Sequence, residues 1–318
     1  MVRAVQNKDS DTIRLGEEVT EDGLYHRRRE IDRMQEPVSY TRKGSLERFL
    51  RCRQATLSLI LILLVLMVSA FAPLFSPYGR DDINLDNILT TPSAEHVLGT
   101  DELGRDVFTR LLYGGRFTLF FALAAVAIAT VIGVILGAIS GYFGGSTDHL
   151  VTGTVDLFLS IPVFLVLLIV MALGGGRGWV IPVVIGMTSW METTRLVRSE
   201  FLKLREEGFV EAARSIGAHD VTLVFKHILP HALPPVIVAA TVGFAQAMLI
   251  ESALSFLGFG IQPPLPTWGN MLQNAQVFLR RSPVVAFAPG FMIFITCLCF
   301  NFVGDGVRGA LASRSRSC

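Results

Sequence analysis

Few side chains in this sequence are spaced so that they could carry out chemistry. His227 and His231 have the i, i+4 spacing that places two imidazoles on one face of a helix, as in a zinc site. Pro230 lies between them and is expected to break that helix, and no third ligand is near. Glu206 and Glu207 have no base or metal ligand beside them. We therefore expect no catalytic site, no metal site and no bound cofactor on this chain.

Carboxylates within apolar runs are the second kind of candidate. Asp156 lies inside one long apolar stretch, and Glu251 lies at the end of another. Because a carboxylate is costly in hydrocarbon, it usually faces a partner or a water-filled path. Both residues could line a translocation path, with Gln246 as a further hydrogen-bonding group. For Asp156 the alternative is an ion pair or hydrogen bond that fixes two helices.

The composition indicates a membrane protein. Of the 318 residues, 51% are hydrophobic and 17% are charged, whereas a soluble domain carries about 25% charged residues. The formal net charge of +1 gives no reason to expect a nucleic-acid partner. We therefore predict an all-α integral membrane protein in contact with lipid.

Six segments are apolar enough to be read as transmembrane helices. A helix rises 1.5 Å per residue, so about 20 residues cross the hydrocarbon layer. The second segment carries Gly133, Gly137 and Gly141 at a spacing that lets helix backbones approach closely. The third is expected to kink at Pro162, and the fourth to continue as a helix out of the membrane. The six expected spans are 55–75, 117–139, 150–173, 179–191, 232–250 and 284–303.

Basic residues predict the orientation. Six spans put both termini on one side, and that side receives 21 of the 28 Lys and Arg residues. Cytoplasmic segments are the ones enriched in such residues. We therefore expect a cytoplasmic tail at 1–54, an extracytoplasmic loop at 76–116, a five-span core at 117–309 and a cytoplasmic tail at 310–318.

The longest polar island between apolar runs is Phe209–Pro230, with the sequence FVEAARSIGAHDVTLVFKHILP. It predicts a helix through Val210 and Ala213, a bend at Gly217 and a second amphipathic helix that Pro230 ends. Helix, bend, helix and proline together predict a docking hairpin on the inner face of a membrane protein.

This island resembles the EAA loop in permease subunits of ATP-binding-cassette importers. The residues that carry the resemblance are Glu211, Ala212, Ala213, Gly217, Ile228, Leu229 and Pro230. The usual spacing would place the isoleucine at His227, whereas here it is Ile228. In the family this loop is a cytoplasmic coupling helix that sits in a groove of the ATPase subunit.

Three further motifs resemble the dipeptide/oligopeptide/nickel group of these permeases, specifically the C-type subunit: HVLGTDELGRDVF at 96–108, ESALSFLGFGIQPPLPTWGNML at 251–272 and GDGVR at 304–308. The resemblance implies a type I importer permease (MetI-like) fold in a bacterial or archaeal plasma membrane. It also implies a heterodimer with a B-type permease, two ATPase subunits that use ATP and Mg²⁺, and an extracytoplasmic substrate-binding protein.

The resemblance implies peptide import, with nickel, glutathione and opine-like compounds as alternatives. We expect Gln262, Pro263 and Trp268 to contact the binding protein or to cover an outer gate. The competing functional class is a self-sufficient secondary transporter. That class needs ion-coupling residues near the middle of the membrane and usually an internal repeat. Asp156 alone is thin support for it.

Overall fold

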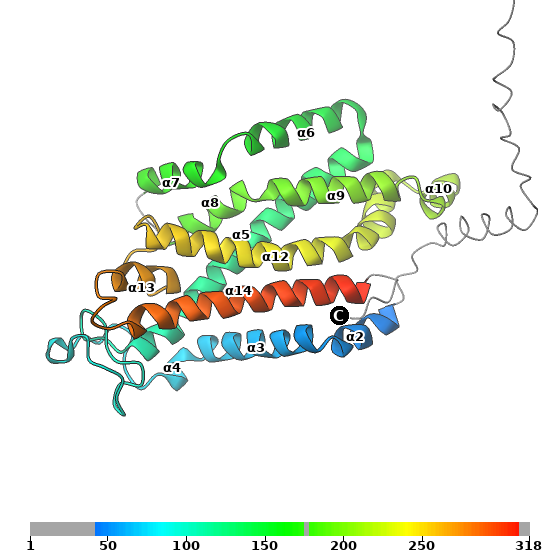
Figure 1. Ribbon diagram of the computed structural model, residues 1–318. Helices are drawn as coiled ribbons and strands as arrows, with labels where there is room; N and C mark the ends of the chain where they lie inside the picture. Colours follow the sequence, from blue (N-terminus) through cyan, green and yellow to red (C-terminus); the bar gives the residue numbers. More distant parts are fainter. Residues whose placement is uncertain (1–41, 175–177, 312–318) are drawn as a thin grey trace, which may run out of the picture. The chain divides into compact units, whose positions relative to one another are not determined.

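Long apolar helices make up most of the chain that the computed structural model describes, which is residues 42–174 and 178–311 (Figure 1). Most of the expected tail at 1–54 therefore lies outside the described residues. Its last part is helical, because α2 spans Arg42–Arg51 and α3 already begins at Arg53. The first expected span corresponds to α3 (Arg53–Ala70) and the short α4 (Ala72–Phe75).

The second span begins earlier than predicted. The loop after α4 contains one short 3-10 turn, η1 (Leu85–Asn87), and ends at Asp106 rather than at 116. The Asp106 side chain accepts a hydrogen bond from the backbone N–H of Thr109 and so caps α5 (Val107–Phe143). This cap gives the Thr109 N–H a partner at the helix start. The helix can therefore begin ten residues before the apolar run expected at 117–139.

The third span is broken at the predicted place. Its two parts, α6 (Gly145–Leu159) and α7 (Val163–Gly174), meet at Pro162 with a bend of 75°. The fourth span is not one helix, because Ser189 separates α8 (Val180–Thr188) from α9 (Trp190–Leu204). As expected, α9 continues toward the polar island.

Pro230 does not end the second helix of the island, so that prediction was wrong. The island contains α10 (Gly208–Ser215), α11 (Asp220–Thr222) and the π-helical turn η2 (Leu223–Ile228), and α12 (Leu229–Phe256) follows directly. A proline cannot donate to the carbonyl four residues earlier and crowds it. The wider π turn just before Pro230 leaves room for the ring, so the chain stays helical.

Two more helices complete the described chain. A short helix, α13 (Trp268–Ala275), lies between α12 and the last helix and was not predicted. Its start is fixed by a capping box in which Thr267 and Asn270 bond each other's backbone N–H groups. The last helix, α14 (Val284–Leu311), runs past the predicted end of the sixth span.

Four helices among the described residues are long and apolar enough to cross a bilayer: Arg53–Ala70, Val107–Phe143, Asp220–Phe256 and Val284–Leu311. The bent pair α6 and α7 gives a fifth crossing if it forms one span. The remaining expected span, 179–191, falls on α8 and the start of α9, which have 9 and 15 residues. Six spans therefore stay a prediction.

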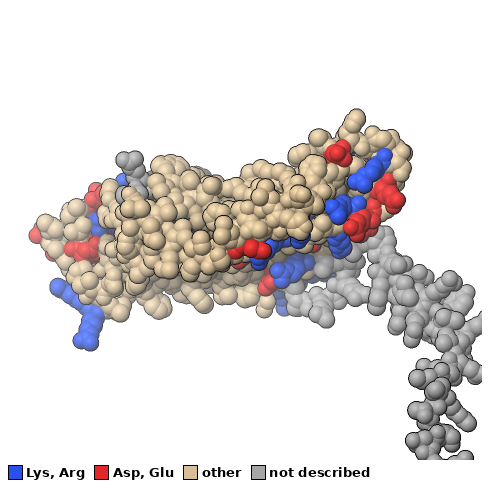
Figure 2. Space-filling model, turned by 90° about the horizontal axis from the view of Figure 1, so that it is seen from above, with Lys and Arg blue, Asp and Glu red and all other residues tan. Residues whose placement is uncertain are grey.

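The helices run side by side between two ends (Figure 1). One end holds α10, α2 and the C-terminal end of α14, and the other holds α13 and the loop between α4 and α5. On the face seen in Figure 2, charged side chains gather at the two ends, a smaller group of red and blue atoms lies near the middle, and most of the remaining surface is uncharged. This distribution is the one that a lipid-embedded helical protein requires.

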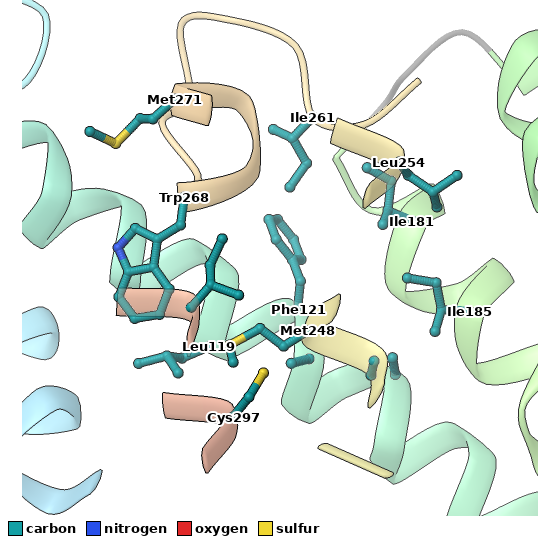
Figure 3. Close-up of a cluster of buried hydrophobic side chains, with 14 of the residues drawn as sticks. Leu119, Phe121, Ile181, Ile185, Met248, Leu254, Ile261, Trp268, Met271 and Cys297 are labelled. Carbon is teal, nitrogen blue, oxygen red and sulfur yellow. The ribbon is translucent and has the colours of Figure 1, made fainter. Parts of the chain in front are cut away.

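The main core lies near the α13 end, where α5, α8, α12, α13 and α14 contribute buried side chains to one cluster (Figure 3). Trp268 is fully buried there. Its ring N–H donates to the carbonyl of Leu111 at 2.9 Å, and its backbone N–H donates to the hydroxyl of Thr118 at 3.1 Å. Trp268 thus joins α13 to α5.

The predicted glycine seam is confirmed. A Cβ added at Gly133 would lie 2.6 Å from Thr193, one at Gly137 would lie 2.7 Å from the carbonyl of Thr194, and one at Gly141 would lie 2.6 Å from Phe201. All three contacts are with α9, so the glycines let α5 and α9 pack backbone to backbone.

Candidate functional site

The hairpin begins with the short amphipathic helix α10. Val210 is fully buried and Ala213 is 6% exposed, whereas Glu211 and Ala212 face outward. The EAA residues therefore divide between an inner and an outer face. Only Ala213 packs inward, which leaves Glu211 and Ala212 available to a partner.

Gly217 makes the predicted bend. The N–H of Gly217 donates to the carbonyl of Arg214 and the N–H of Ala218 to the carbonyl of Ala213, which closes the end of α10 in a Schellman arrangement. The φ angle of Gly217 is +84°, a value that side chains with a Cβ adopt at a cost. No atom lies within 4 Å of a Cβ built at Gly217, so a larger residue there would not collide with the described chain.

The inner face of the hairpin rests on α9 and on the end of α5. Leu223 and Ile228 are fully buried and join a cluster with Val197, Phe201 and Tyr142. The isoleucine of the motif is therefore buried at position 228, whereas His227, at the position where the family usually has the isoleucine, is only partly buried. Leu229 is half-buried, while Pro230 is exposed at the start of α12.

The outer face of the hairpin is apolar as well as charged. Ile216 is 87% exposed, Val221 69% and Phe225 65%. Large apolar side chains exposed together mark a contact surface. Ile216 lies just after the end of α10 at Ser215, next to the Gly217 turn.

The two histidines of the hairpin lie close together, and His231 makes two contacts within the hairpin. The ring nitrogen Nδ1 of His231 donates to the carbonyl of His227 at 2.7 Å. The His231 ring also lies against the ring of Phe209, with centroids 5.0 Å apart. The helix break expected at Pro230 is absent, so His227 and His231 lie on one continuous helical stretch.

Two polar contacts that were not predicted fix this region: one ties the hairpin to α5, and the other ties α9, on which the hairpin rests, to α6. The Tyr142 hydroxyl donates to Asp220 at 2.5 Å, which ties the end of α5 to the second helix of the hairpin. Nη2 of Arg198 in α9 donates to Asp148 of α6 at 2.6 Å, and the Arg198 Nε donates to the other carboxylate oxygen. Asp148 was not among the predicted residues, although its position two residues before the span expected at 150–173 was a usable signal.

Asp156 is an ion-pair residue in this structure. Its carboxylate accepts a hydrogen bond from the guanidinium of Arg195, which joins α6 to α9. Both side chains are more than half exposed. The alternative interpretation, a pair that links two helices, is therefore the one that the structure matches.

Glu251 does not line an open path here. It is fully buried, and it accepts a hydrogen bond from the hydroxyl of Ser255 at 2.8 Å and a longer one from Ser252 at 3.5 Å. Both partners lie on α12 itself. Burial among hydroxyl groups makes this carboxyl part of the core near α13, so the expectation that it lines the path is not met in this structure.

Gln246 faces a cavity. The cavity is about 270 Å³ and lies between α5, α8, α9, α12 and α14. Its lining also includes Glu192 and Arg308, which the sequence reading did not connect. Of the three residues proposed for a translocation path, only Gln246 lines this space.

The outer candidates separate into core and surface. Trp268 is fully buried and has no surface for a binding protein to contact in this structure, so that part of the prediction was wrong, while a place at an outer gate stays a prediction. The capping box at Thr267 starts α13 at Trp268, whose side chain lies in the core. Gln262 and Pro263 are exposed, and the Gln262 side chain donates to the carbonyl of Gly258 at 2.9 Å.

The motif at 96–108 is built from buried polar pairs. His96 lies 3.0 Å from Asp106, and the Nε of Arg105 donates to Asp101 at 2.7 Å. Arg110, on the first turn of α5, has its Nε 3.5 Å from the same Asp101 carboxylate. These pairs fold the outer loop onto the start of α5, so their direct role is structural.

A family model gives this architecture its context. The model of the binding-protein-dependent transport system inner membrane component matches residues 133–317, more than half of the chain. The chain belongs to this family. A second model, the N-terminal transmembrane domain of oligopeptide transport permease C, matches residues 41–92. This permease is therefore a multi-pass membrane protein, and permease components of such importers are not themselves ATPases.

Similar curated proteins cover nearly the whole permease. The dipeptide transport system permease protein DppC of Alkalihalophilus pseudofirmus is 40% identical over 263 residues, covering 83% of this chain and 86% of that protein. The oligopeptide transport system permease protein OppC of Bacillus subtilis is 36% identical over 274 residues, covering 86% and 90%. The glutathione transport system permease protein GsiD of Pectobacterium atrosepticum is 35% identical, covering 85% and 90%.

A solved structure shares the fold. A chain of the MetNI methionine ABC transporter in inward-facing conformations matches with a TM-score of 0.51 and 22% identity, covering 63% of this permease and 96% of that chain. The type I importer permease fold is therefore established for the core of the molecule, and the secondary-transporter alternative is not favoured.

Proposed function

We propose that this permease is the C-type subunit of an ATP-driven importer of di- and oligopeptides. It forms half of a translocation pore, and a B-type permease subunit forms the other half. Two ATPase subunits supply the energy from Mg²⁺-ATP, and an extracytoplasmic binding protein delivers the substrate. Relatives named as dipeptide and oligopeptide permeases, 36–40% identical over more than four fifths of the chain, support this substrate class.

The two-sided hairpin carries the coupling part of the proposal. Its inner face is held by α9 and α5, while its outer face presents Ile216, Val221 and Phe225 beside Glu211. A rigid element with an exposed apolar face fits a groove of an ATPase subunit. The motion of that subunit would then reach the pore through α9, on which the hairpin rests.

The orientation follows from the same end of the molecule. The hairpin, α2 and the end of α14 lie at the same end of the molecule (Figure 1), and 21 of the 28 Lys and Arg residues lie in the sequence segments expected on this side, 1–54, 195–231 and the residues after 303. We assign this end to the cytoplasm of a bacterial or archaeal cell. At the other end, the loop at 76–106 and the exposed Gln262 and Pro263 would meet the binding protein.

The test uses the complete importer in lipid nanodiscs and in liposomes. Glu211→Lys reverses an exposed charge on the docking face, and Gly217→Val places a β-branched residue at a φ of +84°, at a cost of about 1–3 kcal/mol. Both variants should assemble with the B-type subunit. In both, substrate-stimulated ATP hydrolysis and uptake should fall together.

Gly208→Val is the matched control for the bend. Gly208 also has open space around an added Cβ, but its φ is not in the positive region. Normal coupled transport in Glu211→Lys and Gly217→Val would contradict the docking assignment. Equal losses in Gly217→Val and Gly208→Val would assign the effect to crowding of the partner rather than to the bend. A panel of di- to hexapeptides, glutathione and Ni²⁺ tests the substrate class in the wild-type importer.

A further inference from the structure

The cavity that Gln246 faces is lined by small residues together with two charged side chains. Its walls are largely small residues of α5 and α12, such as Ala125, Ala129, Ala240 and Gly243. Glu192 of α9 and Arg308 of α14 add one negative and one positive charge to the same cavity. These two residues are 116 positions apart in the sequence, so only the fold brings them to one space.

Neither charge is neutralised within the described part of the chain. No ion pair within 4 Å joins Glu192 or Arg308 to another described residue, although Asp156, Asp148 and Asp101 all have arginine partners. Both side chains are exposed to the cavity or to solvent. Charged side chains that line a cavity between helices, as these two do just beyond the expected ends of the fourth and sixth spans, usually face water or a bound group.

The chemistry of the lining fits a small zwitterion. A carboxylate binds an ammonium group, a guanidinium binds a carboxylate in bidentate fashion, and a carboxamide both donates and accepts. An unblocked peptide carries one group of each kind: a terminal ammonium, a terminal carboxylate and an amide between them. The volume of about 270 Å³ lies just below the range of about 300–1,000 Å³ found for small-molecule pockets, which suits a short main chain.

We propose that this cavity is a binding site for the main chain of an unblocked short peptide on its way through the permease. The α-ammonium group lies at Glu192, the α-carboxylate at Arg308, and the Gln246 amide contacts the peptide bond. The side chains of the peptide extend into the half of the path that belongs to the partner subunit. This subunit therefore does not discriminate between peptides by their side chains. This inference rests on the proposed peptide transport and adds the location and the recognised groups.

The test measures binding at the site without the binding protein. Ser189 lines the cavity, so Ser189→Cys in a background with the four native cysteines replaced by alanine gives a reporter thiol. The assembled importer in nanodiscs is reacted with a small thiol reagent in the presence of alanyl-alanine, its N-acetyl form or its C-terminal amide. We expect alanyl-alanine to slow the reaction, and each blocked form to need at least a tenfold higher concentration for the same protection.

The variants assign each terminus to its partner. In Glu192→Gln the free and N-acetylated peptides should protect alike, and in Arg308→Gln the free and amidated peptides should protect alike. Equal protection by all three peptides in the wild type, or no protection, would overturn the site. So would an equal loss for all three peptides in both variants.

ATP-driven uptake of alanyl-alanine by the wild-type importer is measured in parallel. If alanyl-alanine is taken up but protection does not depend on its termini, the proposed binding site is refuted and the proposed function is retained. If no peptide is taken up, the proposed function fails. The site then stands only if protection still depends on both termini, and it falls if protection is lost as well.

Discussion

Replacing Gly137 with alanine should separate α5 from α9 and disturb everything that α9 supports. Gly137 lies in the middle of the glycine seam, where the two helices touch through their backbones. A built Cβ would lie 2.7 Å from the carbonyl oxygen of Thr194, 2.7 Å from the Cβ of Val197 and 3.0 Å from the backbone nitrogen of Arg198. Two of these three atoms belong to the backbone of α9, so no side-chain rotation can relieve the contact.

The size of the effect follows from these distances. Non-bonded carbon atoms rest about 3.5–4.0 Å apart, so the helices would have to separate by roughly 1 Å. Overpacking of this kind costs about 1–3 kcal/mol, and the better helix propensity of alanine returns up to about 1 kcal/mol. A net destabilisation of about 1–2 kcal/mol should lower the melting temperature by an amount on the order of 2–8 °C.

The assay is thermal unfolding of the purified importer, followed by the loss of the intact complex on size-exclusion chromatography. Gly153→Ala is the control, because Gly153 also lies inside a helix, α6, but has no atom within 4 Å of an added Cβ. The control should melt like the wild type or slightly higher. If Gly137→Ala melts within about 1 °C of that control, the close contact between α5 and α9 at Gly137 does not limit the stability of the complex.

Three further changes test single contacts. Trp268→Phe keeps an aromatic ring but removes the hydrogen bond from the indole N–H to the Leu111 carbonyl, which still accepts its helical bond within α5. The complex should therefore lose about 0.5–1.5 kcal/mol of stability in thermal unfolding while its affinity for the binding protein is unchanged. A double-mutant cycle with Asp148→Asn and Arg198→Gln should give a coupling free energy of about 1–2 kcal/mol in denaturant unfolding, and additive effects would deny the pair any role. Tyr142→Phe should lower uptake per ATP hydrolysed with little change in melting temperature, whereas Tyr113→Phe, whose hydroxyl has no hydrogen-bond partner among the described residues, should do neither.

Features that depend on local spacing could be predicted from the sequence. The glycines at 133, 137 and 141 recur every four residues, so they share one helix face wherever the helix goes, and the seam with α9 confirms it. Gly217 stands where an amphipathic pattern stops, and its φ of +84° confirms the bend. Pro162 likewise marked the break between α6 and α7.

Features that depend on partners far along the chain could not be predicted. The proline rule suggested a helix end at Pro230, but the π turn before it absorbs the missing hydrogen bond. Trp268 read as exposed because nothing local shows that α5 offers it a carbonyl at Leu111. The same limit applies to Glu192 and Arg308, since their meeting in one cavity is a property of the packed helices and not of either segment.

The helix α9 joins the two sites that the structure brings out. Its first turns carry Glu192 into the cavity, its middle lies on the glycines of α5, and its end continues into the hairpin through Leu204. A helix that is held by close contacts along its length would lose them if it bent locally. A displacement at one end of α9 is therefore expected to move the whole helix. A shift of the hairpin by an ATPase subunit would therefore move Glu192 relative to Arg308, which lies on α14. Such a movement would change the distance between the two charged groups of the cavity, and with it the affinity of the cavity for a zwitterion.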